Sequence, residues 1–411
     1  MVTSHALSGT SFRDPRAGNK AALRNSRPSI FETFEQAASL DPTLRVSRAH
    51  LGALSRRELR PVSFSRDLMF SSMQKGMPLL VDDLQVAVRR EQECGTRDAV
   101  LGALSEGFPQ NQKIRVRCGP SGEQRLLVVK DLLRRWTGTR ARTHVTDWHI
   151  RGTGVSKHID CSQLSDFNLL AGARGEPGAQ EMLTMVVSSA GALSDSHSDD
   201  PDGSNHCFRG RKLWLVWDTF VGLSRDLEDV SRCEVSTYAA FNIESFLSVP
   251  GSRWFTIESG QTLFLPGHLT HKVVTLDDYL GVGSFFVMLP SYLRTLIRWT
   301  RHTPLWALSA PEHRRLDLVN QITRLVLSKV RALEGEPEKE RSRWGINYLQ
   351  SAVEEWWRTC SDAGKQELLD NRISAELVRS VLPKNTGIRT YPVLGRRVAG
   401  LPQHRIPQSV L

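Results

Sequence analysis

Two histidines and one aspartate have the types and the spacing of a metal site. His197-Ser198-Asp199 sets an imidazole and a carboxylate two residues apart, and His271 follows 72 residues after the aspartate. Residues i and i+2 of a β-strand point to the same side, so one strand can supply the first two ligands and another strand the third. Two histidines and a carboxylate form the facial triad that holds Fe(II) and leaves positions open for a co-substrate and O2.

The flanking sequence separates this triplet from a second one, His158-Ile159-Asp160. Apolar, strand-like runs lead into His197 at 182–187 and away from it at 212–217, which sets the triplet at the lip of a sheet. The second triplet is followed by a glycine-containing loop at 172–178 instead. We therefore predict the metal site at the first triplet.

The third ligand has two candidates, because His268 lies three residues before His271. We expect His271 to bind the metal, since it lies five residues after Pro266 and immediately before the strand-like run 272–275.

Short apolar runs with Gly and Pro turns dominate residues 143–290 and predict an antiparallel barrel or sandwich. A hairpin is expected around the turn 119–122. Helical spacing of apolar residues predicts helices at 30–38, 47–59, 82–90, 130–136, 291–301, 311–334, 346–360 and 362–381. Together these patterns indicate a mainly β fold with helical additions.

The net charge of +10 is concentrated at the two ends of the chain. Residues 1–30 carry +4 and residues 379–411 carry +6, so residues 31–378 are neutral overall. This excludes a folded polybasic platform for nucleic acid, and leaves weak nucleic-acid contact through two flexible basic tails.

Cysteine usage and hydropathy indicate the compartment. The six cysteines form no CxxC pair, so neither a zinc module nor a disulfide framework is expected, and a reducing compartment is favoured. No apolar signal segment and no membrane-length run are found. We expect an intracellular protein, nuclear or cytoplasmic. The Arg- and Ser-rich first tail is also typical of a mitochondrial transit peptide.

The chain resembles the JmjC family of Fe(II)- and 2-oxoglutarate-dependent oxygenases, within the cupin superfamily. The resemblance rests on His197-x-Asp199, on Lys212 at 15 residues after His197, on the Pro-Gly turn before His271, and on the run Asp147-Trp148-His149. It covers roughly residues 60–300 and is nearest to the small hydroxylase-type members.

This resemblance implies a domain organisation around a double-stranded β-helix core of the cupin or jelly-roll type. The expected units are a disordered basic tail at 1–27, an N-terminal extension of helices and strands at 28–140, the JmjC core at 141–300, a helical region at 301–382 and a flexible basic tail at 383–411.

The resemblance also assigns roles to the matching residues. His197, Asp199 and His271 would ligate Fe(II) and form the catalytic centre. Lys212 would pair with the distal carboxylate of 2-oxoglutarate. A single buried lysine suits that role, because a dicarboxylate that chelates iron at one end keeps a second charge inside the barrel. Ser194 matches a position where a hydroxyl often joins this interaction.

The sequence departs from the family pattern in three places. Gly203 stands where hydroxylase-type members often have Asn, with Asn205 two residues further on. Trp217-Asp218 replaces a common Pro-Pro. Ser284 is the only polar candidate twelve to fifteen residues beyond His271, where it would contribute to co-substrate binding.

The function we expect is oxidation with Fe(II), 2-oxoglutarate and O2, directed at a protein or peptide substrate. The reaction would be hydroxylation of a side chain or demethylation of methyl-lysine; the lack of a zinc-binding reader module weakens the second. Oxidation of a small metabolite and a catalytically inactive cupin that serves as an interaction protein remain alternatives. Trp344, Trp356 and Trp357 of the C-terminal helices are typical of helix packing, with a homodimer face as the alternative. No membrane contact is expected.

Overall fold

The computed structural model describes residues 28–118, 123–138, 143–171, 182–199, 202–219, 241–301 and 312–382. About 47% of these residues are helical and 27% lie in strands, so the expectation of a mainly β fold is wrong. The chain is a mixed α/β protein with antiparallel sheets. The helices that raise this fraction above the expectation lie outside the two sheets, against their outer faces and at one end. The predicted tails and the predicted loops at 119–122 and 172–178 lie outside the described residues.

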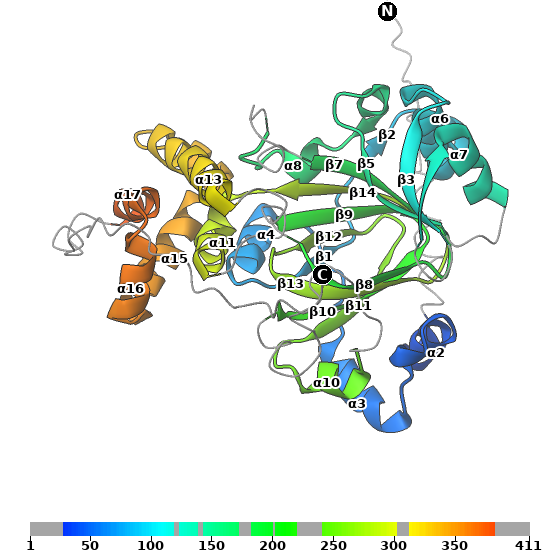
Figure 1. The fold of residues 1–411 in the computed structure, drawn as a ribbon, viewed down its shortest axis with the longest axis horizontal. Helices are drawn as coiled ribbons and strands as arrows, with labels where there is room; N and C mark the ends of the chain where they lie inside the picture. The colour runs from blue at the N-terminus through cyan, green and yellow to red at the C-terminus, as the bar shows by residue number, and fades with distance from the viewer. Residues whose placement is uncertain are drawn as a thin grey trace, which may run out of the picture.

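Two sheets form the centre of the molecule (Figure 1). The larger has the order β1 (Leu79–Val81), β12 (Thr262–Leu265), β9 (Asp202–Arg209), β14 (Tyr279–Phe286), β7 (Met182–Ser188), β5 (Thr143–His149), β3 (Lys113–Cys118) and β4 (Glu123–Val128). The smaller has the order β11 (Arg253–Glu258), β10 (Arg211–Asp218), β13 (Leu269–Thr275) and β8 (Leu193–Ser198). A separate pair joins β2 (Ala87–Val88) to β6 (Ile159–Asp160). Each named strand pair is antiparallel.

The two sheets face each other, and the side chains of each strand alternate between the space inside and the outer face. Trp214 and Val216 of β10 lie in one buried cluster with Leu263 of β12, so this cluster is shared by both sheets. Leu213 and Trp217 of the same strand pack in a different cluster, on the outer side of the smaller sheet. Each fully buried aliphatic side chain of this kind stabilises the fold by ~1.5–3 kcal/mol. β10 is therefore buried on both faces, which accounts for its continuous apolar run.

Helices cover the outer faces of the sheets (Figure 1). The outer face of the smaller sheet packs against α2 (Ile30–Leu40), η2 (Pro42–Leu44), α3 (Arg48–Arg57) and α10 (Ile243–Ser248). The larger sheet packs against α4 (Arg66–Gln74), α6 (Thr96–Gly107), α7 (Val129–Gly138), η3 (Gly154–Lys157) and α8 (Ser162–Ser165); α5 (Glu91–Cys94) precedes α6.

A buried ion pair ties the N-terminal elements to the smaller sheet. Lys272 of β13 points outward, and its Nζ lies 2.8 Å from Oδ2 of Asp41, the residue before η2. Both side chains are almost completely buried. Asp41 also accepts a hydrogen bond from the backbone of Thr43, so its carboxylate has partners on both sides.

The predicted helix at 82–90 is wrong. Leu84, Val86 and Val88 are buried while their neighbours Gln85 and Ala87 are exposed, so the burial period is that of a strand. The segment accordingly contains β2. Its apolar residues alternate in the sequence, and this period of two outweighs the helical propensity of the residues between them.

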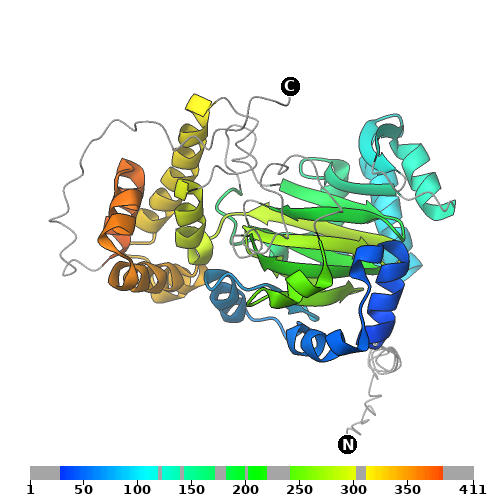
Figure 2. The ribbon, with the colours of Figure 1, turned by 60° about the horizontal axis from the view of Figure 1, so that its bottom comes forward.

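The C-terminal helices form a separate apolar cluster at one end of the sheets, as Figure 2 shows. They are α11 (Leu289–Arg301), α13 (Glu312–Ala332), α15 (Ile346–Thr359), α16 (Asp362–Leu369) and α17 (Arg372–Val381). The short helix α14 (Glu338–Arg343) lies between α13 and α15 in the chain and has no buried residue. The helix expected at 362–381 is two helices, because Asn371 caps the backbone N–H groups of Ile373 and Ser374 and starts α17.

Candidate metal centre

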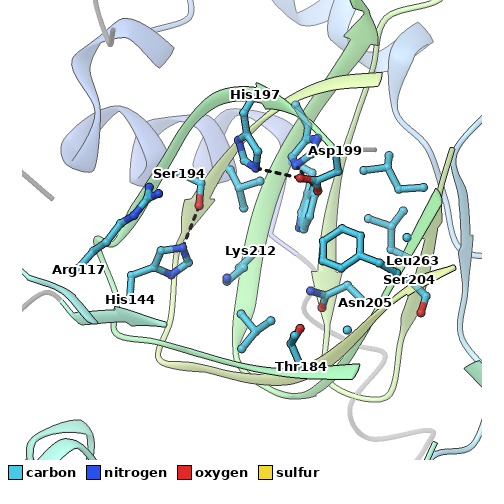
Figure 3. Close-up of a pocket in the computed structure, with 18 residues that line it drawn as sticks. Arg117, His144, Thr184, Ser194, His197, Asp199, Ser204, Asn205, Lys212 and Leu263 are labelled. Carbon is cyan, nitrogen blue, oxygen red and sulfur yellow. Dashed lines mark hydrogen bonds and ion pairs between the residues drawn. The ribbon is translucent and has the colours of Figure 1, made fainter. Parts of the chain in front are cut away.

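His197, Asp199 and His271 come together on the neighbouring strands β8 and β13. One ligand atom of each lies within 4.8 Å of the others. His271 Nε2 is 3.6 Å from Asp199 Oδ2, and His197 Nε2 is 3.9 Å from Asp199 Oδ1 (Figure 3). No other group of His, Cys, Asp and Glu in the described ranges has this geometry. The group can hold a metal ion and has the donor set of a 2-His-1-carboxylate site.

Strand register positions the ligands. His197 of β8 lies directly opposite His271 of β13, and their ring centroids are 4.2 Å apart. A β-bulge follows, since the next opposed pair is Ser194 with Val273. Asp199 comes immediately after β8, and its carbonyl accepts a hydrogen bond of 3.0 Å from the backbone N–H of His268. The turn that enters β13 therefore holds Asp199 beside His271.

Burial keeps His271 in the form that binds metals. Its side chain is 2% exposed, and burial, with a smaller contribution from His197, lowers the pKa of His271 to about 4. The imidazole is therefore neutral at pH 7. Its Nδ1 lies 3.2 Å from the carbonyl oxygen of Leu269. Because a carbonyl only accepts, Nδ1 carries the hydrogen and Nε2 presents its lone pair toward Asp199.

The alternative ligands lie elsewhere. His268 has a left-handed backbone (φ 67°) at the turn before β13 and is not a member of the metal-binding group. His158 Nε2 lies 3.6 Å from Glu106, and Asp160 accepts a hydrogen bond from the backbone of Ser162. Of the two triplets, the one at His197 forms, together with His271, the group of described residues that could hold a metal ion.

A pocket of about 240 Å³ adjoins these ligands, between the two sheets. Its polar lining includes the predicted residues Ser194 and Lys212 (Figure 3). Lys212 lies on the same face of β10 as Trp214, which also lines the pocket. Because Val216 is opposite His271, Lys212 is four residues along β10, about 13 Å from the level of the metal ligands. The pocket thus has a metal-binding end and a cationic end.

Lys212 is a buried cation. Its side chain is 2% exposed, and burial lowers its pKa to about 7. Its Nζ lies 4.5 Å from the ring centroid of Tyr279, a cation–π contact. No carboxylate of the described residues forms an ion pair with it. This end of the pocket is therefore suited to bind an anion, whose negative charge would pair with the ammonium group of Lys212.

His144 of β5 is a pocket residue that the motifs did not indicate. Its Nδ1 lies 2.6 Å from Ser188 Oγ and its Nε2 3.1 Å from Ser194 Oγ. Burial, followed by the charges of Lys212 and Arg117, lowers the pKa of His144 well below its usual value, so the ring is neutral. The only signal in the sequence is a polar residue within a strand-like run, and the pairing that gives it meaning is remote.

None of the described side chains in the run Asp147-Trp148-His149 lines the pocket. Trp148 is buried against Phe108 in the outer cluster of the larger sheet, with ring centroids 4.9 Å apart, and His149 is exposed. A bulge between Val145 and Trp148 separates this part of β5 from His144.

Ser284 does not reach the pocket. On β14, Gly283 and Phe285 line it, and Ser284 points to the opposite face, where its Oγ is buried. Counting residues from His271 identified the right strand and the wrong face. Asn205 of β9 does line the pocket and accepts a hydrogen bond from the Tyr279 hydroxyl. An amide is therefore present near the position that Gly203 leaves empty.

No protein-family model matches this chain, and a search of curated proteins found no match. Among the described residues, no helix combines the length and the apolar character needed to cross a bilayer.

Proposed function

We propose that this chain is an Fe(II)- and 2-oxoglutarate-dependent oxygenase of the JmjC type that acts on a protein substrate. In the overall reaction, 2-oxoglutarate and O2 are converted to succinate and CO2. One oxygen atom enters succinate and the other enters a C–H bond of the substrate as a hydroxyl group. The observation that carries the proposal is that the metal-binding group and a buried lysine without a described carboxylate partner share one pocket.

The order of the last eight strands supports a double-stranded β-helix core. β7, β9, β12 and β14 lie in the larger sheet, and β8, β10, β11 and β13 in the smaller. The two sets have matching orders, β12-β9-β14-β7 and β11-β10-β13-β8. Eight strands that cross between two facing sheets in this way are the pattern of a jelly roll.

The donor set fits iron. His197, Asp199 and His271 would hold Fe(II), since two imidazoles and a carboxylate on one side leave the other coordination positions open. The bound iron would supply the oxidation chemistry with O2. The hydrogen bond from Nδ1 of His271 to Leu269 would keep its Nε2 directed at the metal.

Lys212 would bind the far carboxylate of 2-oxoglutarate. Its distance along β10 from the metal ligands is bridged by the lysine side chain together with a short dicarboxylate. Ser194, held by His144, would add a hydroxyl hydrogen bond at this end. The neutral imidazole of His144 avoids a second buried positive charge beside the ammonium group.

The test is co-substrate turnover. Purified protein is supplied with Fe(II), ascorbate and 2-oxoglutarate, and succinate is measured by mass spectrometry. We expect succinate from the wild type, a loss of at least 100-fold in Asp199→Ala, and wild-type turnover in the control Asp160→Ala, which changes the other His-x-Asp triplet. Equal turnover in Asp199→Ala would contradict the proposal. A wild type that binds neither Mn(II) nor 2-oxoglutarate would favour the inactive scaffold.

The product separates the two protein reactions. Demethylation of methyl-lysine releases formaldehyde, because the hydroxymethyl product breaks its C–N bond. Hydroxylation adds 16 mass units and releases none. We propose hydroxylation, since the 15-residue step from His197 to Lys212 resembles that of the small hydroxylase-type members of the family.

A further inference from the structure

The larger sheet extends beyond the smaller one on the side of β5, β3 and β4. The pocket reaches this extension, because His144 of β5 and Arg117 of β3 are among its lining residues (Figure 3). The hydrogen bond between His144 and Ser194 of β8 marks the point where the edge of the smaller sheet meets the extension. The exposed side of β3 and β4 therefore continues directly from the rim of the pocket.

This side of β3 and β4 is basic and open, and we call it the β3–β4 ledge. On β3, Ile114, Val116 and Cys118 are buried toward the helices, and the alternate residues are exposed. In an antiparallel pair, directly opposed residues share a face. The ledge accordingly consists of the opposed pairs Lys113 with Val128, Arg115 with Leu126, and Arg117 with Gln124.

Among the residues that the structure describes, the cations of the ledge have no acidic partner. Within the described ranges, no ion pair involves Lys113, Arg115 or Arg117. The acid of this hairpin, Glu123, lies on the other face and pairs with Arg125 at 2.7 Å. Beside the cations, Leu126 is 64% exposed. A row of cations beside an exposed apolar side chain is complementary to an acidic partner that also has aliphatic groups.

We propose that the β3–β4 ledge binds the protein substrate, and that the bound segment is an extended acidic peptide which passes a side chain into the pocket. Arg115 and Arg117 are two residues apart, and this spacing of roughly 7 Å matches acidic residues at alternate positions of an extended chain. The inference rests on the proposed function for the pocket and adds the class of substrate. Arg117, which belongs to both surfaces, binds the acidic residue nearest the oxidised side chain.

A peptide fits the ledge better than a nucleic acid does. Surfaces that bind single strands place aromatic side chains among the cations, so that bases can stack on them. The six ledge residues include no aromatic side chain. They include Leu126 and Val128, which suit the aliphatic parts of a polypeptide.

The test uses a fluorescein-labelled peptide of about a dozen residues with glutamate at every second position and alanine between. Its binding to the full chain is measured by fluorescence anisotropy at low salt. Neutralising each cation in Arg115→Gln or Arg117→Gln should weaken binding roughly three- to fivefold, and the double variant at least tenfold. The matched control Arg125→Gln removes a charge from the other face of the same hairpin and should change binding less than twofold. Wild-type affinity in the double variant would overturn the proposal.

Two further probes complete the test. The same peptide with glutamine in place of glutamate should bind at least tenfold more weakly than the glutamate peptide. A single-stranded oligonucleotide of matching length should also bind more weakly, and tighter oligonucleotide binding that is lost in the double variant would replace the peptide by a nucleic acid.

The proposal for the ledge and the proposal for the oxygenase can be refuted independently. The anisotropy measurement needs neither iron nor 2-oxoglutarate, and succinate formation without peptide does not need the ledge. A chain that forms succinate but does not bind the peptide through Arg115 and Arg117 refutes the ledge alone. A chain that binds the peptide there but forms no succinate refutes the oxygenase and leaves the ledge as a peptide-binding surface.

Discussion

Replacement of Lys212 by methionine is expected to stabilise the empty protein and to abolish co-substrate binding. Lys212 is 2% exposed and has no carboxylate partner among the described residues. Methionine is unbranched and close to the lysine stem in length, so it can occupy the same space without the charge. A side chain with a purely structural role would give the opposite change in stability.

The magnitude follows from the pKa of the buried lysine. Burial lowers that pKa from 10.5 to about 7. At pH 7 this difference makes the folded state about 4 kcal/mol less stable than it would be with an unperturbed lysine. The cation–π contact with Tyr279 offsets ~1–2 kcal/mol. Lys212→Met should therefore raise the free energy of unfolding by about 2–3 kcal/mol.

The effect has a defined pH dependence. Between pH 7 and pH 10, the unfolded lysine holds its proton and the buried lysine has largely lost it. Because the unfolded state then binds more protons, the free energy of unfolding of the wild type rises with pH in this window. The variant lacks this contribution, so its stability advantage should be largest below pH 7 and should shrink toward pH 10.

Urea unfolding followed by tryptophan fluorescence measures stability, and calorimetric titration of 2-oxoglutarate in the presence of Mn(II) measures binding. The exposed Lys130→Met serves as control and should change stability by less than ~0.5 kcal/mol. A Lys212→Met protein that is less stable than wild type and still binds 2-oxoglutarate would refute the reasoning.

Three further outcomes are expected. His271→Ala should lose stoichiometric Mn(II) binding in electron paramagnetic resonance titrations, while His268→Asn, which suits the left-handed backbone there, should keep it; the reverse would exchange the two ligands. The affinity for 2-oxoglutarate should fall up to tenfold per pH unit above pH 7 as Lys212 loses its proton, and calorimetry across pH would expose a flat profile. Lys272→Met should lower stability by about 3–5 kcal/mol in urea unfolding, because Asp41 would remain buried without its partner; an unchanged value would mean that the pair contributes nothing.

Local patterns in the sequence were sufficient to predict the group that could hold a metal ion and most of the elements around it. The triplet at His197 and the turn before His271 are short motifs, and the apolar runs on either side became β7, β10 and β13. These features need only the period of a strand and the position of a turn, both of which a chain records within a few residues.

The rest of the pocket depends on pairing between distant strands. His144 and Arg117 come from strands that precede β7, and they reach the pocket only because β5 pairs with β7 and β3 with β5. Ser284 failed for a related reason, since a count from His271 cannot fix which face of β14 a residue occupies. A shift of one residue exchanges the two faces of a strand, and only the observed register resolves it.

The bulge in β8 determines which side chains of this strand face the pocket. Ser194 and His197 are three residues apart, so in a regular strand they would point to opposite faces. Because β8 places two residues, 195 and 196, opposite the single residue Lys272, both side chains enter the same pocket. The bulge thus lets a spacing of three residues bring both side chains to one face of β8. Straightening β8 at its present length would turn one of them away from the pocket, whereas deletion of residue 195 or 196 would leave them two residues apart in a regular strand and still on one face.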